Sequence, residues 1–410
     1  MTSSGSGTPV RPGDSAADLS TGRKLLYTAV MLGFSLAVTV AAFEAALRIS
    51  KRNVAFQPDP ELIRSLRPNT VHPLRVFETP ENLSGRSEEI PDTPLVIGEN
   101  RTNNVGLRMS RDVGPKAPGE RRVLLLGDSY TEAIFCLEEK RFDNVALPLL
   151  EAGGDGPWTV VNGGIQNGAP SQYVLLLRRY LPLFEPDVVV VVTGANDLYD
   201  DMQFNRRYGF VVDDAGLPVG LENPLQLRLL KDSYLLRYAH LLLEIFAPAS
   251  LDALFPPADP SLEPLDWMSL ACRQSPDARS QFERFTGRYL AGLRDLAEAA
   301  GARFGVLVVH YSFSFGEEPF HPDRFPDGIR ETLAERECYE ARARPYSELV
   351  QAFLEREGVP YRDTLAAFEE AKAEEPARKL WHFYDHHFSP DGHRIAGREL
   401  HALVRELTGP

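Results

Sequence analysis

The chain has 410 residues, 43 % hydrophobic and 25 % charged, a composition that excludes wholesale disorder and leaves room for one large domain or two modest ones. Its 58 acidic and 44 basic residues give a net charge of −14, which argues against a nucleic-acid-binding protein, since such proteins need a basic face. Three cysteines are too few for a disulfide scaffold, although Cys272 and Cys338 could form one bridge if the domain is exported. No CxxC motif or Cys/His cluster indicates a zinc site, and we expect neither a metal nor a cofactor.

An uncharged apolar run at residues 25–43 is long enough, as a helix, to cross a bilayer. A buried core helix would carry a polar face, whereas this run has only isolated hydroxyl groups. The main alternative is a cleaved signal peptide, because small residues follow the run. We favour an uncleaved transmembrane helix over residues 25–47, since Glu44 and Arg48 extend a helical i,i+4 pair beyond the apolar end.

The segments around this helix are polar. Residues 1–24 are predicted to be a disordered tail, and residues 48–118, rich in Pro, Asn and Arg, a juxtamembrane stem with short strands. More basic residues follow the helix than precede it, which weakly favours a cytoplasmic C-terminal part. Long domains cross membranes despite such charges, so this count does not decide the orientation.

Residues 119–410 alternate between short apolar runs and helical patterns. Alternation of this kind predicts a parallel sheet with helices on both faces, and a continuous apolar run is typical of a strand buried on both sides. The predicted strands are Val123–Leu126, Thr159–Val161, Val188–Val192, Val306–Val309 and, more weakly, Val359–Tyr361.

Residues 198–280 interrupt the alternation and are interpreted as an insertion. They contain an apolar helix around Leu225–Phe246, followed by a proline-rich stretch. The insertion could cap a site, lean on the membrane, or serve packing alone.

Four polar segments follow predicted strands or lie near the end of the chain. Ligands of open parallel sheets bind outside the carboxyl ends of the strands, where such segments converge. The segments are Gly127–Thr131, Asn162–Gly168, Thr193–Asp197 and Asp385–Ser389.

Each segment has a chemical and a structural interpretation. Ser129 could be a nucleophile, but a Gly-Asp-Ser turn is more often a helix cap. Glycines in the second segment could bring a backbone N–H to a ligand, or simply make a flexible turn. Asn196 could donate to an oxyanion or form an Asx turn. His387 could act as a general base with Asp385 fixing its tautomer, whereas a histidine in a polar loop is usually just solvated.

Taken in order, Ser, Gly, Asn and Asp-x-His resemble the SGNH (GDSL-type) hydrolase superfamily. The matching blocks read GDSYT, GAND and DHHFSPDGH, and the resemblance covers about residues 100–410. Residues 104–108 also match an Asn-x-Gly-x-Arg element of membrane-tethered members. The resemblance implies a flavodoxin-like three-layer α/β/α sandwich with a central parallel sheet, preceded by the transmembrane helix.

The resemblance implies a role for each matching residue. Ser129 is the nucleophile, His387 its general base, and Asp385 orients His387. The oxyanion hole consists of the Ser129 backbone N–H, a backbone N–H of the second block and the Asn196 side chain. The second block departs from the family pattern, because Asn167-Gly168 stands where one glycine is expected. Gly168 is the predicted donor and Asn167 the alternative.

Other polar residues near these blocks could line the pocket. Asp128 and Gly194 flank the nucleophile and Asn196, and His310 ends a predicted strand, where a packed histidine is as plausible. The Asp-x-His spacing disfavours His386 as the base, and His393 is interpreted as structural.

The leading functional hypothesis is a membrane-anchored serine esterase that removes acyl groups, such as acetyl, from a small molecule, glycan or lipid. An O-acyltransferase using the same triad is the alternative, and a catalytically idle binding or scaffold domain is a third. The resemblance places the catalytic domain outside the cytoplasmic membrane. No nucleic-acid partner is expected.

Overall fold

The computed structural model describes the apolar N-terminal helix and most of residues 96–409. The residues outside this description are 1–20, 51–55, 58–64, 67–70, 76–95, 134–135, 223–232, 263–275, 316–343, 383–386 and 410. Asp385, His386, Cys272 and Cys338 therefore lie outside the described residues.

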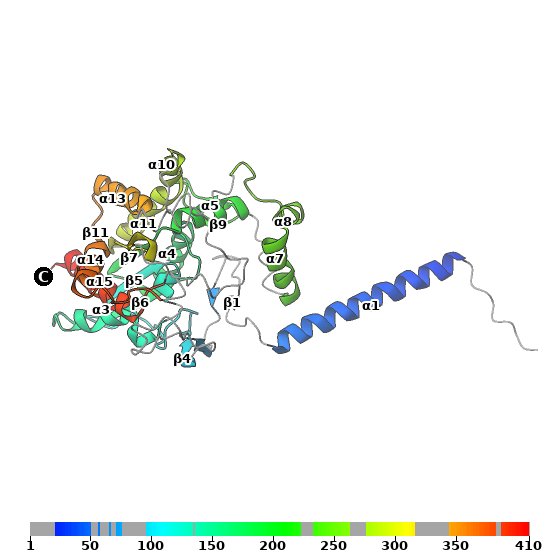
Figure 1. The fold of residues 1–410 in the computed structure, drawn as a ribbon, viewed down its shortest axis with the longest axis horizontal. Coiled ribbons are helices and arrows are strands. Elements are labelled where there is room, and N and C mark those ends of the chain that lie inside the picture. The colour runs from blue at the N-terminus through cyan, green and yellow to red at the C-terminus, as the bar shows by residue number, and fades with distance from the viewer. Residues whose placement is uncertain are drawn as a thin grey trace, which may run out of the picture.

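A five-stranded parallel sheet forms the centre of the domain, in the order β11-β10-β7-β5-β6 (Figure 1). Its strands are β5 (Arg121–Gly127), β6 (Trp158–Gly164), β7 (Val188–Thr193), β10 (Arg303–Val308) and β11 (Tyr361–Asp363). This is the flavodoxin-like order, and the topological switch point lies between β5 and β7.

The five strands predicted from apolar runs are confirmed, and the predicted start of the last one is wrong. β11 starts at Tyr361 and not at Val359. The Val359 N–H donates to the Leu354 carbonyl at the end of the preceding helix, and Pro360 has no N–H to give to a ladder.

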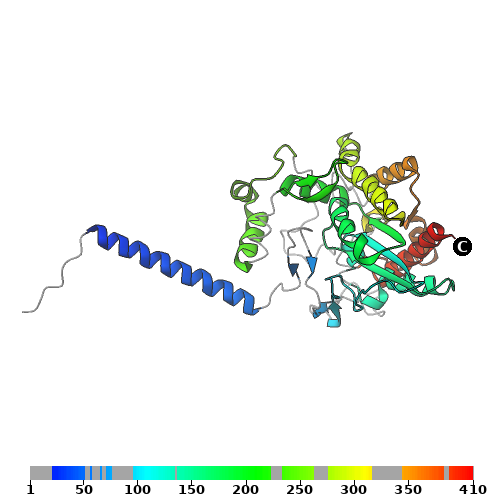
Figure 2. The ribbon, with the colours of Figure 1, turned by 180° about the vertical axis from the view of Figure 1, so that it is seen from behind.

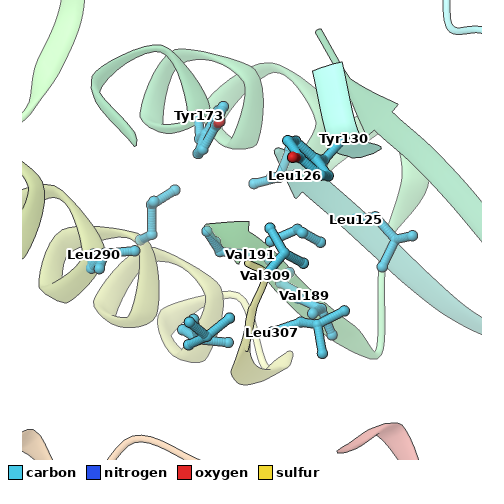
Figure 3. Close-up of a cluster of buried hydrophobic side chains, with 14 of the residues drawn as sticks. Leu125, Leu126, Tyr130, Tyr173, Val189, Val191, Leu290, Leu307 and Val309 are labelled. Atoms are coloured by element: carbon cyan, nitrogen blue, oxygen red, sulfur yellow. The ribbon is translucent and has the colours of Figure 1, made fainter. Parts of the chain in front are cut away.

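Helices cover both faces of the sheet. α4 (Pro170–Phe184) and α11 (Arg288–Ala299) pack together over one face, and α3 (Phe142–Glu151) and α15 (Pro390–Thr408) over the other. Figure 3 shows Tyr173 of α4 and Leu290 of α11 facing the sheet residues Leu126, Val191 and Val309. Both faces of β7 meet helices, which explains why the strand consists of five valines before Thr193.

The remaining elements of the domain surround this sandwich or connect its parts. They are α2 (Ser129–Glu132), η2 (Glu138–Lys140), α5 (Asp197–Arg207), the antiparallel pair β8 (Phe210–Val212) and β9 (Pro218–Leu221), α7 (Tyr234–Phe246), α8 (Pro248–Leu254), α10 (Pro276–Phe282), the π-helical turn η3 (Glu283–Gly287), η4 (Ser312–Phe315), α13 (Pro345–Glu357) and α14 (Leu365–Glu374).

The apolar helix predicted around Leu225–Phe246 is α7, which starts at Tyr234. The Ser233 side chain caps it by accepting from the Leu236 N–H, while residues 223–232 lie outside the described part.

The N-terminal helix α1 (Thr21–Ser50) extends away from the domain with exposed apolar side chains (Figures 1 and 2). It is long and apolar enough to cross a membrane. The expected Glu44–Arg48 pair is present, with Oε1 and Nε 2.8 Å apart. Short antiparallel pairs follow: β1 (Phe56–Gln57) with β2 (Ser65–Leu66), and β3 (Val71–Arg75) with β4 (Val96–Arg101).

Candidate active site

Ser129 and His387 meet at the carboxyl end of β5. Asp128 caps α2, which places Ser129 as the first residue of that helix, directly after β5. The Ser129 Oγ lies 2.7 Å from the His387 Nε2, although the two residues are far apart in sequence. That distance is a hydrogen bond along which a proton can be transferred from a hydroxyl to an imidazole.

Two glycines in register allow the turn at Ser129 to form. Gly127 at the end of β5 pairs with Gly164 at the end of β6. A Cβ at Gly127 would lie 2.0 Å from the Thr131 Oγ1, and one at Gly164 would lie 2.2 Å from the Glu132 backbone nitrogen. The end of β6 therefore packs directly on the backbone of α2.

A buried arginine holds the other end of α2. The Arg108 guanidinium donates to the Glu132 carbonyl at 2.6 Å, to the Ala133 carbonyl, and to the Cys136 carbonyl at 2.5 Å. Ala133 ends the helix in the left-handed region, with φ 56°. Carbonyls at a helix end have no intrahelical partner, and here one planar cation satisfies them.

Arg108 lies within a compensated group of buried charges. Arg141 donates to the Arg108 carbonyl and forms a bidentate pair with Asp143, with Nη2 and Oδ2 2.6 Å apart. Burial lowers the pKa of Arg108 to about 10 and raises the pKa of the Glu132 carboxyl. Removing one member would leave an uncompensated charge in the interior.

His387 lies on a segment tied down on both sides. Its carbonyl accepts from the His382 N–H at 2.9 Å, and the Tyr130 ring stacks on its imidazole with centroids 5.0 Å apart. Ser389 then caps α15 by accepting from the Gly392 N–H. The imidazole is thereby held toward Ser129. Asp385, its predicted partner, is outside the described residues.

Asn196 is positioned by a tyrosine that the sequence analysis missed. It is the N-cap residue of α5, and its Oδ1 accepts from the Tyr311 hydroxyl at 2.8 Å. Its Nδ2 donates to Asp200 at 2.9 Å. The available signal was the position of Tyr311, just after β10 at the same edge of the sheet.

Buried carboxyls lie beneath this edge. Burial raises the pKa of Asp128 and raises that of Asp197 well above its usual range. Asp201 accepts from the Ser171 N–H at 2.8 Å and the Thr286 hydroxyl at 2.7 Å, and burial raises its pKa to about 7.

The second block forms a turn around the two predicted oxyanion donors, Gly168 and its alternative Asn167. The Gly168 N–H donates to the Ile165 carbonyl at 3.0 Å, within a turn in which Asn167 takes the left-handed conformation with φ 53°. The Glu132 carboxylate accepts from the Gln166 backbone. Gly168 is therefore engaged inside the turn, and Asn167, which is exposed, becomes the candidate of this block.

The other predicted pocket residues have structural partners. His310, which follows β10, is buried with Nε2 2.7 Å from the Asp363 Oδ1 and Nδ1 3.4 Å from the Ser347 Oγ, so it links this end of β10 to β11 and α13. The Gly194 N–H donates to Asp197. His393 is buried and stacks on Phe142. Among the residues that the structure describes, none form a metal-binding group of three or more His, Cys, Asp or Glu side chains.

Comparison with known proteins identifies the family. The model of the GDSL-like lipase/acylhydrolase family matches residues 125–395, and the chain belongs to this family. It is a serine ester hydrolase. No curated protein matches the chain.

Several solved structures are distantly similar. An acetyl xylan esterase, AlAXEase, is 12 % identical with a TM-score of 0.37, covering 69 % of this chain and 99 % of its own. A catalytic mutant of the Geobacillus stearothermophilus acetylxylan esterase Axe2 is 15 % identical with a TM-score of 0.35, over 69 % and 94 %. A GDSL-like lipase from Bacteroides thetaiotaomicron VPI-5482 is 14 % identical with a TM-score of 0.32, over 70 % and 89 %.

Gly164→Ala should displace the turn that carries Ser129, because the new methyl group meets backbone and not a flexible side chain. We expect a loss of about 1–3 kcal/mol in the free energy of unfolding and slower labelling by a fluorophosphonate. Gly220→Ala is the matched control, since its Cβ would meet nothing within 4 Å. Equal effects of the two substitutions on labelling would contradict the close packing of β6 on α2.

Arg108→Lys keeps the charge but cannot serve the carbonyls at the end of α2 in a planar fork. We expect denaturant unfolding to show a loss of about 3–5 kcal/mol, the range for breaking a buried ionic group. The control, Arg356→Lys, alters an exposed ion pair with Glu283 and should cost less than about 1 kcal/mol. A loss at Arg108 no larger than that of the control would show that the fork is dispensable.

Asp201 should make the protein less stable as pH rises. The folded chain retains the proton up to a pKa of about 7, whereas an unfolded aspartate loses it near 3.8. The contribution of Asp201 to stability is therefore largest below pH 3.8, the pKa of the unfolded aspartate. It decreases as the pH rises toward the folded pKa of about 7. Between about pH 5 and about pH 8, unfolding midpoints should fall less in Asp201→Asn than in the wild type.

Asp213→Asn is the matched control for this pH series. The Leu217 backbone N–H lowers the pKa of Asp213, so that group stays ionised over the same range. Its replacement should leave the pH slope unchanged. If the unfolding midpoint of Asp201→Asn falls with pH as steeply as that of the wild type, other groups cause the pH dependence.

Proposed function

We propose that Ser129, His387 and Asp385 form the catalytic triad of this ester hydrolase. The observation that carries the proposal is the 2.7 Å separation of the Ser129 Oγ and the His387 Nε2 at the carboxyl end of β5. Ser129 is buried and His387 is half-buried, so packed protein holds the two side chains in this geometry. Asp385 is assigned from its Asp-x-His spacing to His387.

In the first half-reaction, the His387 Nε2 takes the hydroxyl proton as the Ser129 Oγ attacks the ester carbonyl carbon. The carbonyl π electrons move to oxygen and give a tetrahedral oxyanion. Its collapse breaks the bond to the alcohol oxygen, which leaves with the proton held by His387. The product of this stage is an acyl-Ser129 enzyme and a free alcohol.

Water completes the reaction at the same carbonyl. His387 removes a proton from water as its oxygen attacks, and a second tetrahedral oxyanion forms. Collapse of this species returns the proton to the Ser129 Oγ and releases the carboxylic acid. Asp385 would stabilise the imidazolium that forms in each half-reaction.

Three N–H donors are proposed for the oxyanion: the Ser129 backbone, the Asn167 backbone and the Asn196 side chain. Ser129 opens α2, where backbone N–H groups have no intrahelical acceptor. In the second block the neighbouring N–H groups of Gln166 and Gly168 already have acceptors, which favours Asn167. Tyr311 donates to the Asn196 Oδ1, which fixes Nδ2 as the donor end of the amide. In the structure Nδ2 donates to Asp200, and Asn196 also hydrogen-bonds Asp128, so the amide would exchange one of these carboxyl partners for the oxyanion.

We further propose that α1 anchors the enzyme in a membrane, with the catalytic domain outside the cytoplasm. The length and apolar character of α1 support the anchor. The proposed substrates are O-acyl esters, such as acetyl esters, of a glycan or lipid at the membrane.

The test uses the full chain in detergent micelles. Wild type should react with a fluorophosphonate and turn over p-nitrophenyl acetate, whereas Ser129→Ala should lose labelling and at least about 10³-fold in kcat. Ser110→Ala is the control, because that serine is exposed and bonds Glu138. Labelling of Ser129→Ala at the wild-type rate would disprove the assignment.

Asp385→Asn tests the third member of the triad. We expect a fall in kcat of about 10²–10⁴-fold from the wrong imidazole tautomer. Asp391→Asn, which alters an exposed pair with Arg394, should leave kcat unchanged. Equal activities of the two variants would remove Asp385 from the mechanism.

A further inference from the structure

One face of α7 is apolar and open to solvent. Of the side chains described on this helix, the exposed ones are Leu236, Ala239, Leu242 and Phe246. Their spacing of three and four residues aligns them along one side of the helix. Phe246 is 77 % exposed, and Leu254 at the end of the next helix, α8, is 65 % exposed. We call these five residues the α7 stripe.

The end of α1 holds the beginning of α7. The Glu44 carboxylate accepts from the Tyr234 N–H at 3.0 Å, the Leu235 N–H at 2.8 Å and the Ser233 hydroxyl at 3.0 Å. Glu44 is the first charged residue after the apolar run of α1. The residue that marks the polar boundary of the run is therefore the residue to which α7 is fixed.

A cation supports the same junction. Arg48 pairs with Glu44, and its guanidinium lies over the Tyr234 ring, 5.7 Å from the centroid. In both views α7 and α8 lie on the side of the domain that faces α1, while α3 lies on the far side (Figures 1 and 2).

We propose that the α7 stripe rests in the interfacial layer of the bilayer that α1 crosses. The inference rests on the proposed anchoring by α1. A helix with one apolar face binds lipid by burying that face at the boundary between headgroups and acyl chains. Because Glu44 fixes α7 at the polar limit of α1, the stripe lies at the depth where this boundary occurs.

The contact between the α7 stripe and the bilayer would fix the orientation of the catalytic site relative to the membrane. Asp252 of α8 accepts from Arg206 at 2.6 Å and from Arg207 at 2.8 Å, both on α5. The N-cap of α5 is Asn196, the proposed oxyanion donor. The bilayer contact, the α8–α5 ion pairs and the site thus form one continuous chain of packed elements.

The test places tryptophan at single positions of the full chain in nanodiscs and measures quenching by brominated phospholipid. Phe246→Trp reports on the stripe and Phe34→Trp on the interior of α1. Leu149→Trp, on a partly exposed site of α3, is the control away from the membrane. Emission of the wild-type chain is subtracted, since it holds three tryptophans.

We expect strong quenching at positions 34 and 246, with at least about twofold more at 246 than at 149. Adding Leu242→Glu should reduce quenching at 246, and adding Leu183→Glu, on α4, should not.

The outcomes separate this inference from the anchoring on which it rests. No quenching at position 34 would overturn the anchor itself. Quenching at 34 without quenching at 246 would keep the anchor and overturn the lipid contact, leaving a protein partner as the occupant of the stripe.

Discussion

The contact between the Arg108 guanidinium and the end of α2 is the interaction on which the site depends. α2 has four residues, too few to hold itself together by its own hydrogen-bond ladder. Three contacts with the rest of the domain stabilise α2. Asp128 caps its start, and Gly164 allows β6 to pack on its backbone. Arg108 donates to the carbonyls at its end. A buried cation is costly, and the nearby acidic groups Glu132 and Asp143 offset that cost.

The sheet could be predicted from sequence because burial on both faces forces continuous apolar runs, such as Val123–Leu126 in β5 and Val188–Val192 in β7. The positions of Ser129 and Asn196 followed from the same reasoning, since both come directly after such runs. The start of β11 could not be predicted in this way, because it depends on which acceptor the Val359 N–H finds in the folded chain.

The choice between Gly168 and Asn167 also needed the structure. Gly168 was predicted because the family pattern has a single glycine where this chain has Asn167-Gly168. The chain places Asn167 in the left-handed region, which this residue tolerates, and uses the Gly168 N–H to close the turn. The partners of Arg108 could not be predicted either. They are backbone carbonyls, which every residue has, so the sequence does not show which of them the guanidinium binds.

His387 reaches Ser129 only through the last part of the chain. The segment before it is joined to the domain by Trp381, whose indole N–H donates to the His310 carbonyl at 3.0 Å, and the segment after it becomes α15, which packs on α3. Ser129 and His387 are separated by 258 positions in sequence. During synthesis, Ser129 therefore emerges long before His387, the base proposed for it. Under that proposal, the serine of the nascent chain has no base until the C-terminal part of the chain has been made and has packed on the domain.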